Sequence, residues 1–149
     1  NAKKTGVKKG LNLYEEKNQS HKVNQLYLNE TFIGSNEISK DIKKKISGYK
    51  NQDTKKGRLN DTCFFITYED TLEKLVVSKM KCYYCNKATK LMHENRRDDK
   101  QWTLDRIDNT LCHTSKNTVI CCLKCNLEKR CRNDKKFKFS KQMRIIKEN

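Results

Sequence analysis

The sequence contains no proline and only five glycines, and no long apolar run is present. A membrane-spanning helix needs roughly 20 consecutive apolar residues, and no lipidation motif is found either, so we expect no membrane partner. No signal peptide is recognisable, which predicts an intracellular protein (in the cytoplasm, or in the nucleus of a host cell if viral) and not a secreted one. Abundant Lys, Asn and Ile beside the missing proline suggest an AT-rich coding sequence, as in some viruses.

Acidic and apolar residues are also scarce. The 149 residues include 34 Lys and Arg against 18 Asp and Glu, which gives a net charge of +16 at pH 7, and 34% of them are hydrophobic. So few apolar residues favour a fold that is stabilised by a bound metal rather than by a large core. The positive excess attracts polyanions, and nucleic acid is the partner that it favours. The alternative is that the charge only keeps the protein dissolved.

The eight cysteines include two Cys-x-x-Cys pairs, Cys82/Cys85 and Cys122/Cys125. Four thiolates satisfy the tetrahedral shell of a structural zinc ion, so these pairs predict a zinc site. The 86–121 insert exceeds the roughly 15–20 residues of a zinc ribbon and must carry structure of its own. Disulfides or free buried thiols are the alternative, and disulfides fit an intracellular protein poorly. Cys121 competes with Cys122, which we choose because it keeps the two-residue gap. The cysteines left over are Cys63, Cys112, Cys121 and Cys131.

The segment inside and after this insert predicts a strand, a loop, a strand and a helix. Residues 102–107 and 117–121 are rich in Trp and β-branched residues and predict the strands. A turn at 108–110 joins them, and the spacing of Leu123 and Leu127 predicts a helix over 122–131. On this helix Asn126 and Arg130 should continue the face that bears Cys122.

Asp105 and Asn126 are candidate ligands for a second metal ion. Carboxylate and amide oxygens suit a hard cation such as Mg²⁺. Two protein ligands would leave positions for water and a phosphate oxygen.

Taken together, these residues resemble the HNH endonuclease motif. The resemblance is carried by Asp105-Arg-Ile-Asp-Asn, His113, Asn117 and Cys122-x-x-Cys-Asn126, and it is strongest to the Asp-Arg-x-Asp subgroup found in phage and giant-virus nucleases. It covers residues 82–130, about a third of the chain. It implies an α+β, zinc-stapled ββα-metal domain that hydrolyses phosphodiester bonds in DNA. Asp105 and Asn126 would bind Mg²⁺ or Mn²⁺, the four cysteines would hold Zn²⁺, and Asn117 would brace the loop.

The sequence departs from the family where the general base is expected. The residue after the metal-binding Asp is usually His, but here it is Arg106, and Cys112 stands where the loop often has Gly. Guanidinium stays protonated, so Arg106 would hold or neutralise the phosphate. His113 is our first candidate for the base, followed by Asp108 and His93.

The rest of the chain predicts a helical segment and a basic arm. Residues 1–35 are expected to form a flexible arm with one short strand at 25–28, and residues 36–81 a helical DNA-contacting segment. The zinc-bound nuclease domain would occupy 82–149 and end in a basic helix over 140–147. Ile38, Ile42 and Ile46 predict a helix over 36–46 that is capped by Ser35. Thr67 should cap a second helix over 68–80, with Leu72, Leu75, Val76 and Met80 on one face.

A basic loop over 48–58 separates these two helices in the prediction. Its side chains are candidates for DNA-backbone contacts with one stacking ring, and a solvated loop is the alternative. The predicted DNA contacts are Tyr49, Lys55, Lys56, Arg58 and Arg130.

Two further hypotheses compete with the nuclease. The first is a non-catalytic zinc module that binds nucleic acid or a protein, and the second is a basic protein that packages nucleic acid. A homodimer is one arrangement that would let a single site per chain cut both DNA strands.

Overall fold

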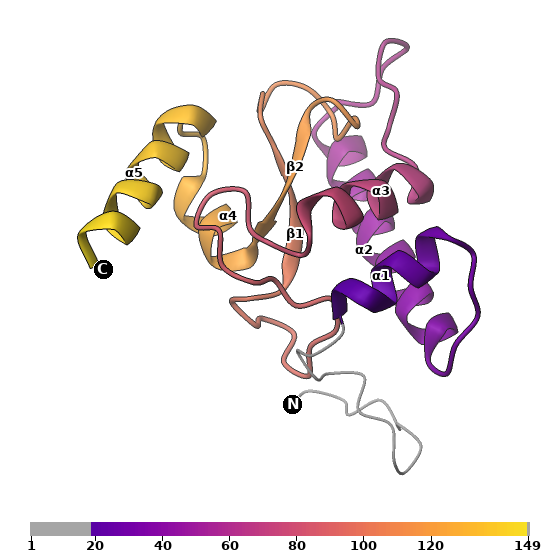
Figure 1. The fold of residues 1–149 in the computed structure, drawn as a ribbon. Coiled ribbons are helices and arrows are strands. Elements are labelled where there is room, and N and C mark those ends of the chain that lie inside the picture. The colour runs from indigo at the N-terminus through magenta and orange to yellow at the C-terminus, as the bar shows by residue number, and fades with distance from the viewer. Residues whose placement is uncertain (1–18, 149) are drawn as a thin grey trace.

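The computed structural model describes residues 19–148, which form a small α+β fold with a two-stranded antiparallel sheet (Figure 1). The predicted order of strand, loop, strand and helix is confirmed. The hairpin lies between helices α1–α3 on one side and helices α4 and α5 on the other. The elements are α1 (Gln19–Tyr27), α2 (Ser35–Lys55), α3 (Tyr68–Ser78), β1 (Trp102–Arg106), β2 (Thr118–Cys122), α4 (Leu123–Lys129) and α5 (Asp134–Glu148).

The two faces of the hairpin contact different parts of the fold. Leu104 pairs with Ile120 and Asp105 with Val119, so successive residues of β1 alternate between the faces. Trp102, Leu104 and Ile120 join the apolar core of α1–α3, whereas Cys121 and Val119 join the cysteine-rich cluster beside α4. Asp105 and Arg106 therefore point to opposite faces of the hairpin.

Helix α2 is longer than the sequence predicted. Ile38 and Ile42 are buried as expected, but the helix continues to Lys55, so the predicted loop is wrong over 48–55. Gly48 did not stop it, because Tyr49 packs against the core and Asp53 is fully buried one turn later. Tertiary contacts of this kind outweigh the low helix propensity of glycine. The predicted Ser35 cap is also wrong, since Gly34 is the N-cap and makes no side-chain capping bond.

Part of the predicted arm is a helix. Val23 and Leu26 are buried three residues apart on α1, so the predicted strand at 25–28 is wrong over the residues that α1 covers. The Gln19 side chain accepts a hydrogen bond from the Leu91 backbone, which ties α1 to the segment before the hairpin. The remainder of the predicted arm, 1–18, lies outside the described residues.

The other helix predictions hold, with shifted ends. Thr67 caps α3 by accepting a 3.1 Å hydrogen bond from the Asp70 amide. The helix ends at Ser78 because Lys79 and Met80 adopt left-handed conformations. The C-terminal helix begins at Asp134, earlier than predicted, after the Asn133 side chain accepts a bond from the Lys136 amide. Within 19–148, no helix is both long and apolar enough to cross a bilayer.

Candidate metal centre and active site

Four cysteine thiols lie close together. Two come from the segment just after Met80, and two come from the junction between β2 and α4. The sulfurs of Cys82, Cys85, Cys122 and Cys125 lie within 4.8 Å of one another, and all four residues are buried. The Cys85 and Cys122 sulfurs are 3.9 Å apart. A zinc–sulfur distance of about 2.3 Å gives a tetrahedron with edges of about 3.8 Å. The cysteines are therefore positioned to hold a metal ion, and their spacing is consistent with zinc.

Backbone amides orient these thiols. The Cys85 amide donates to Cys82 Sγ at 3.5 Å, and the Cys125 amide donates to Cys122 Sγ at 3.4 Å. Hydrogen bonds from Cys122 and Cys125 lower the pKa of Cys82 and of Cys85, and hydrogen bonds within the same cluster raise the pKa of Cys122 and Cys125. A bound metal would require all four as thiolates. Cys121 lies on the opposite strand face from Cys122, with its sulfur 3.3 Å from the Thr103 hydroxyl, whereas the Cys122 sulfur belongs to the four-sulfur cluster. The structure thus selects Cys122 over Cys121 as a ligand.

Asp105 lies on the same face as this cluster, inside a buried network. Its Oδ2 accepts a 2.5 Å hydrogen bond from the Tyr84 hydroxyl and lies 2.8 Å from Lys129 Nζ. Lys129 is fully buried and also donates to the Arg106 carbonyl at 3.0 Å. Neither Tyr84 nor Lys129 was predicted from the sequence as a partner of Asp105. Lys129 follows Cys125 by four residues and so shares its helix face, which is a signal that was available.

Asn126 faces β1 and forms hydrogen bonds with the two residues that precede Asp105. Its Nδ2 donates to Thr103 Oγ1 at 3.1 Å and to the Leu104 carbonyl at 3.5 Å. The amide oxygen therefore remains as the acceptor on this face. Helical spacing predicted that Arg130 would continue this face, and that prediction is wrong. Helix α4 ends at Lys129, and Arg130 is exposed with a positive φ.

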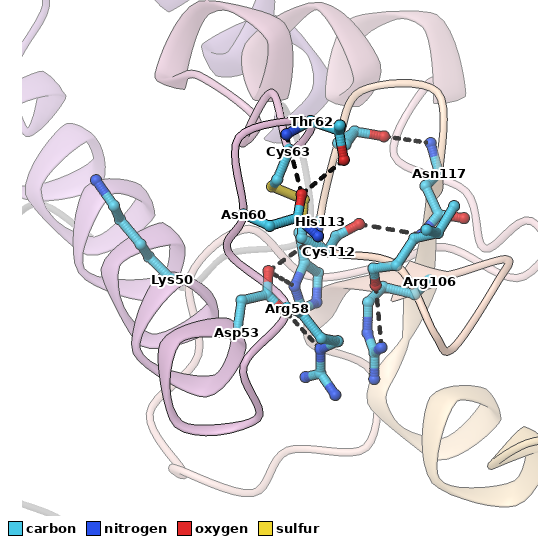
Figure 2. The surroundings of a disulfide bond; sticks show 12 residues. Lys50, Asp53, Arg58, Asn60, Thr62, Cys63, Arg106, Cys112, His113 and Asn117 are labelled. Carbon is cyan, nitrogen blue, oxygen red and sulfur yellow. Dashed lines mark hydrogen bonds and ion pairs between the residues drawn. A yellow bond between two sulfur atoms is a disulfide. The ribbon is translucent and has the colours of Figure 1, made fainter.

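His113 belongs to a second cluster on the other side of the hairpin. Its Nδ1 lies 2.7 Å from Asp53 Oδ2, and its backbone amide donates to the same oxygen at 2.8 Å (Figure 2). Arg58 Nε donates to the other Asp53 oxygen at 2.8 Å. The Tyr49 ring packs 4.8 Å from the imidazole, centroid to centroid. Nothing in the sequence pattern singled out Asp53, which lies 60 residues from His113.

Burial and charge keep this histidine neutral near pH 7. Burial lowers the pKa of His113, and the opposing effect of Asp53 does not restore it. Burial alone would raise the pKa of Asp53, but hydrogen bonds from His113 and Arg58 outweigh it and hold that pKa below its usual value. Asp53 therefore remains a carboxylate that fixes one imidazole nitrogen.

The loop between the strands is held from inside by Asn117. Its Oδ1 accepts from the Asp108 amide at 2.8 Å, and its Nδ2 donates to the carbonyls of Asp108 and Cys112 at 3.0 Å each. Arg106 Nη1 donates to the carbonyls of Asn109 and Leu111 in the same loop. Of the other candidate bases, Asp108 accepts bonds from Thr110 within its turn, and His93 Nδ1 lies 2.6 Å from the Asn95 carbonyl.

The predicted DNA-contacting residues have different surroundings. Tyr49 is not an exposed stacking ring: it packs inward, and its hydroxyl accepts a 3.1 Å bond from the Leu104 amide. Lys55 and Lys56 are exposed at the end of α2. The side chain of Arg58 is only 14% exposed and is held by Asp53.

Two cysteines that the sequence analysis left unpaired form a disulfide. Cys63 bonds to Cys112 and links the segment after α2 to the residue before His113 (Figure 2). The bond spans 49 residues. Spacing could not reveal it, because the two partners come together only after α2 packs against the hairpin loop.

Replacing both Cys63 and Cys112 with serine should lower the free energy of unfolding by about 2–4 kcal/mol, because a long loop is no longer constrained in the unfolded chain. Urea unfolding of the zinc-loaded proteins without reductant would measure the change. Cys131→Ser, which alters an exposed free cysteine, is the control. Equal midpoints for the double variant and the control would contradict the prediction.

No protein-family model matches the chain, and no curated protein or solved structure matches it either.

Proposed function

We propose that the protein is a metal-dependent DNA endonuclease with an HNH-type ββα-metal site. The observation that carries the proposal is the position of Asp105 and Asn126. Asp105 near the end of β1 and Asn126 on α4 lie on one hairpin face, and four clustered cysteines join α4 to that hairpin. Oxygen ligands next to a thiolate cluster fit two different metals, a hard catalytic ion and a structural zinc ion.

In this proposal the two metal sites have separate tasks. Cys82, Cys85, Cys122 and Cys125 hold Zn²⁺ and fix α4 against the hairpin. Asp105 and Asn126 hold Mg²⁺ or Mn²⁺, which would polarise a phosphoryl oxygen and stabilise the leaving oxygen. Asn117 keeps the connecting loop in place through its hydrogen bonds.

His113 is the proposed general base, because it is neutral and has one nitrogen to spare. Asp53 holds Nδ1, while Nε2 has no partner among the described residues. The His113 side chain is 3% exposed, so only a small part of the imidazole is open to solvent. His113 and Asp105 approach from different faces, but Asp105 and Arg106 are the last two residues of β1. A phosphate lying across this end of the hairpin would therefore meet both clusters.

A supercoiled-plasmid assay tests the proposal. Zinc-loaded protein should nick the plasmid with added Mg²⁺ or Mn²⁺ and leave it intact with EDTA or with no added divalent ion. Asp105→Ala and Asn126→Ala should each reduce nicking at least a hundredfold, while Asn51→Ala, at an exposed position of α2, should retain it. Undiminished nicking by Asp105→Ala would overturn the site assignment. Linear product at high protein concentration would indicate paired copies acting on both strands.

A zinc module that binds nucleic acid without cutting is the second candidate. It is favoured by one observation, the pairing of Asp105 with Tyr84 and Lys129, which gives the carboxylate a structural partner. Both functions predict DNA binding that weakens steeply with salt, given the net charge of +16. A plasmid that is retarded in a gel but uncut in every metal would support the module and reject the nuclease.

A further inference from the structure

A cluster of unpaired hydrogen-bond donors lies beside Asp53. Arg58 uses Nε to bind Asp53, and Arg106 uses Nη1 to bind the loop carbonyls. Among residues 19–148, both terminal nitrogens of Arg58 and the Nε and Nη2 of Arg106 have no partner, and beside them lies His113, whose Nε2 is an acceptor in the neutral imidazole. Figure 2 shows these three side chains gathered around the disulfide-linked loop.

The cluster is preorganised. Asp53 is fully buried and binds both Arg58 and His113. Arg106 is fixed by the carbonyls of Asn109 and Leu111. Arginines that are held in this way lose little side-chain freedom when they bind a ligand, which favours affinity.

The Arg106 guanidinium has no directly bound carboxylate within the described part of the chain. Both Asp53 oxygens are already bound by Arg58 and His113, and Asp105 and Asp108 act on Arg106 only through their charge. The charge of Arg58 acts on Arg106 and contributes, after burial, to a lowered pKa of that side chain. Like charges at close range repel, so an anion bound between them would be favoured.

We propose that Arg58 and Arg106, beside His113, form a phosphate-binding site at the end of the hairpin. The ligand class is a tetrahedral phosphate oxyanion, which the planar fork of arginine matches with two parallel hydrogen bonds. Its assignment to a phosphodiester of DNA rests on the proposed function, in which Arg106 follows a ligand of the catalytic ion. Arg58 is one of the DNA contacts predicted from the sequence, whereas Arg130, another of them, is exposed beyond the end of α4.

Binding of two probes to zinc-loaded protein without added divalent ion would test the site. The probes are inorganic phosphate and an oligothymidylate that has hydroxyls at both ends and therefore only diester phosphates. The His113 imidazole NMR signals report on the site, and the chain has only three histidines. Both probes should shift these signals, and the oligonucleotide should do so at lower concentration because its neighbouring phosphates add backbone contacts.

Arg58→Lys and Arg106→Lys keep the net charge but remove the fork, so each should weaken oligonucleotide binding about tenfold with an unchanged salt dependence. Arg132→Gln, at an exposed arginine, is the control: it should reduce the salt dependence and leave the His113 shift intact. Lysine variants that bind as tightly as the parent, or a saturating oligonucleotide that leaves the His113 signals unmoved, would overturn the proposal. A response to inorganic phosphate alone would overturn only its assignment to the DNA backbone.

This experiment separates the site from the nuclease. Cleavage is not measured, so loss of the endonuclease proposal in the plasmid assay would leave the binding result standing. Conversely, intact metal-dependent cleavage by both lysine variants, together with unchanged binding, would reject the phosphate site alone.

Discussion

Removal of metal from the four-cysteine cluster should abolish the fold of the hairpin and α4. Structural zinc in small domains contributes about 10–16 kcal/mol of apparent binding free energy, which equals or exceeds the roughly 5–15 kcal/mol of total stability that a domain has. The cysteine-rich core has few other apolar members, chiefly Tyr84 and Phe137. We therefore expect Cys125→Ser, or chelation of the parent protein, to unfold this half of the molecule.

The measurement can use the single tryptophan. Trp102 is buried in β1 beneath Lys45, which packs over its ring, so its fluorescence should shift to that of exposed indole when the hairpin is lost. Cys121→Ser is the matched control, because Cys121 is buried next to Cys122 but faces Thr103. It should retain one zinc per chain and a cooperative thermal transition, whereas Cys122→Ser should lose both. Zinc binding by Cys122→Ser and its loss from Cys121→Ser would reverse the ligand assignment.

The sequence was most informative where chemistry fixes spacing. Two residues between cysteines allow both sulfurs to face one ion, so the cluster could be predicted without knowledge of the fold. The β-branched residues around Leu104 and Ile120 predicted both strands, and the Thr67 cap was visible as a side chain three residues before Asp70. These features depend on local geometry, which the order of residues encodes directly.

Features that depend on long-range packing were missed. Composition favoured a loop around Gly48 and an arm around Val23, yet both segments are helical because each buries residues against distant parts of the chain. The Cys63–Cys112 bond joins residues far apart in the sequence, as does the contact between Asp53 and His113. No spacing rule reports that two loops will meet, so these partners emerge only from the fold.

The four cysteines gather as predicted, whereas the polar residues of the predicted site divide between the two faces of the hairpin. The alternation of β1 could have shown that Asp105 and Arg106 diverge, since successive strand residues point to opposite faces. Arg130 was misplaced because the end of a short helix is difficult to predict from periodicity. Lys129, one residue earlier, instead reaches Asp105.

Replacing Lys129 with methionine should lower the free energy of unfolding by about 3–5 kcal/mol, because it leaves the buried Asp105 carboxylate without its cation. Lys124→Met, on the exposed side of the same helix, should have little effect. The double variant Lys129→Met/Asp105→Asn should recover most of the loss, since no unpaired charge remains. Urea unfolding of the parent, Lys129→Met, Asp105→Asn and the double variant would give the coupling free energy.

The same variants distinguish the two functions proposed for this site. If Asp105 binds a divalent ion, Mg²⁺ should stabilise Lys129→Met by supplying the missing positive charge, by about 2.7 kcal/mol when its concentration is a hundred times the dissociation constant. The double variant lacks the carboxylate and should not respond. Absence of any Mg²⁺ effect on Lys129→Met would mean that Asp105 serves only as the partner of Lys129 and Tyr84. That result would favour the zinc module, because the carboxylate would then have a structural role and no catalytic ion to hold.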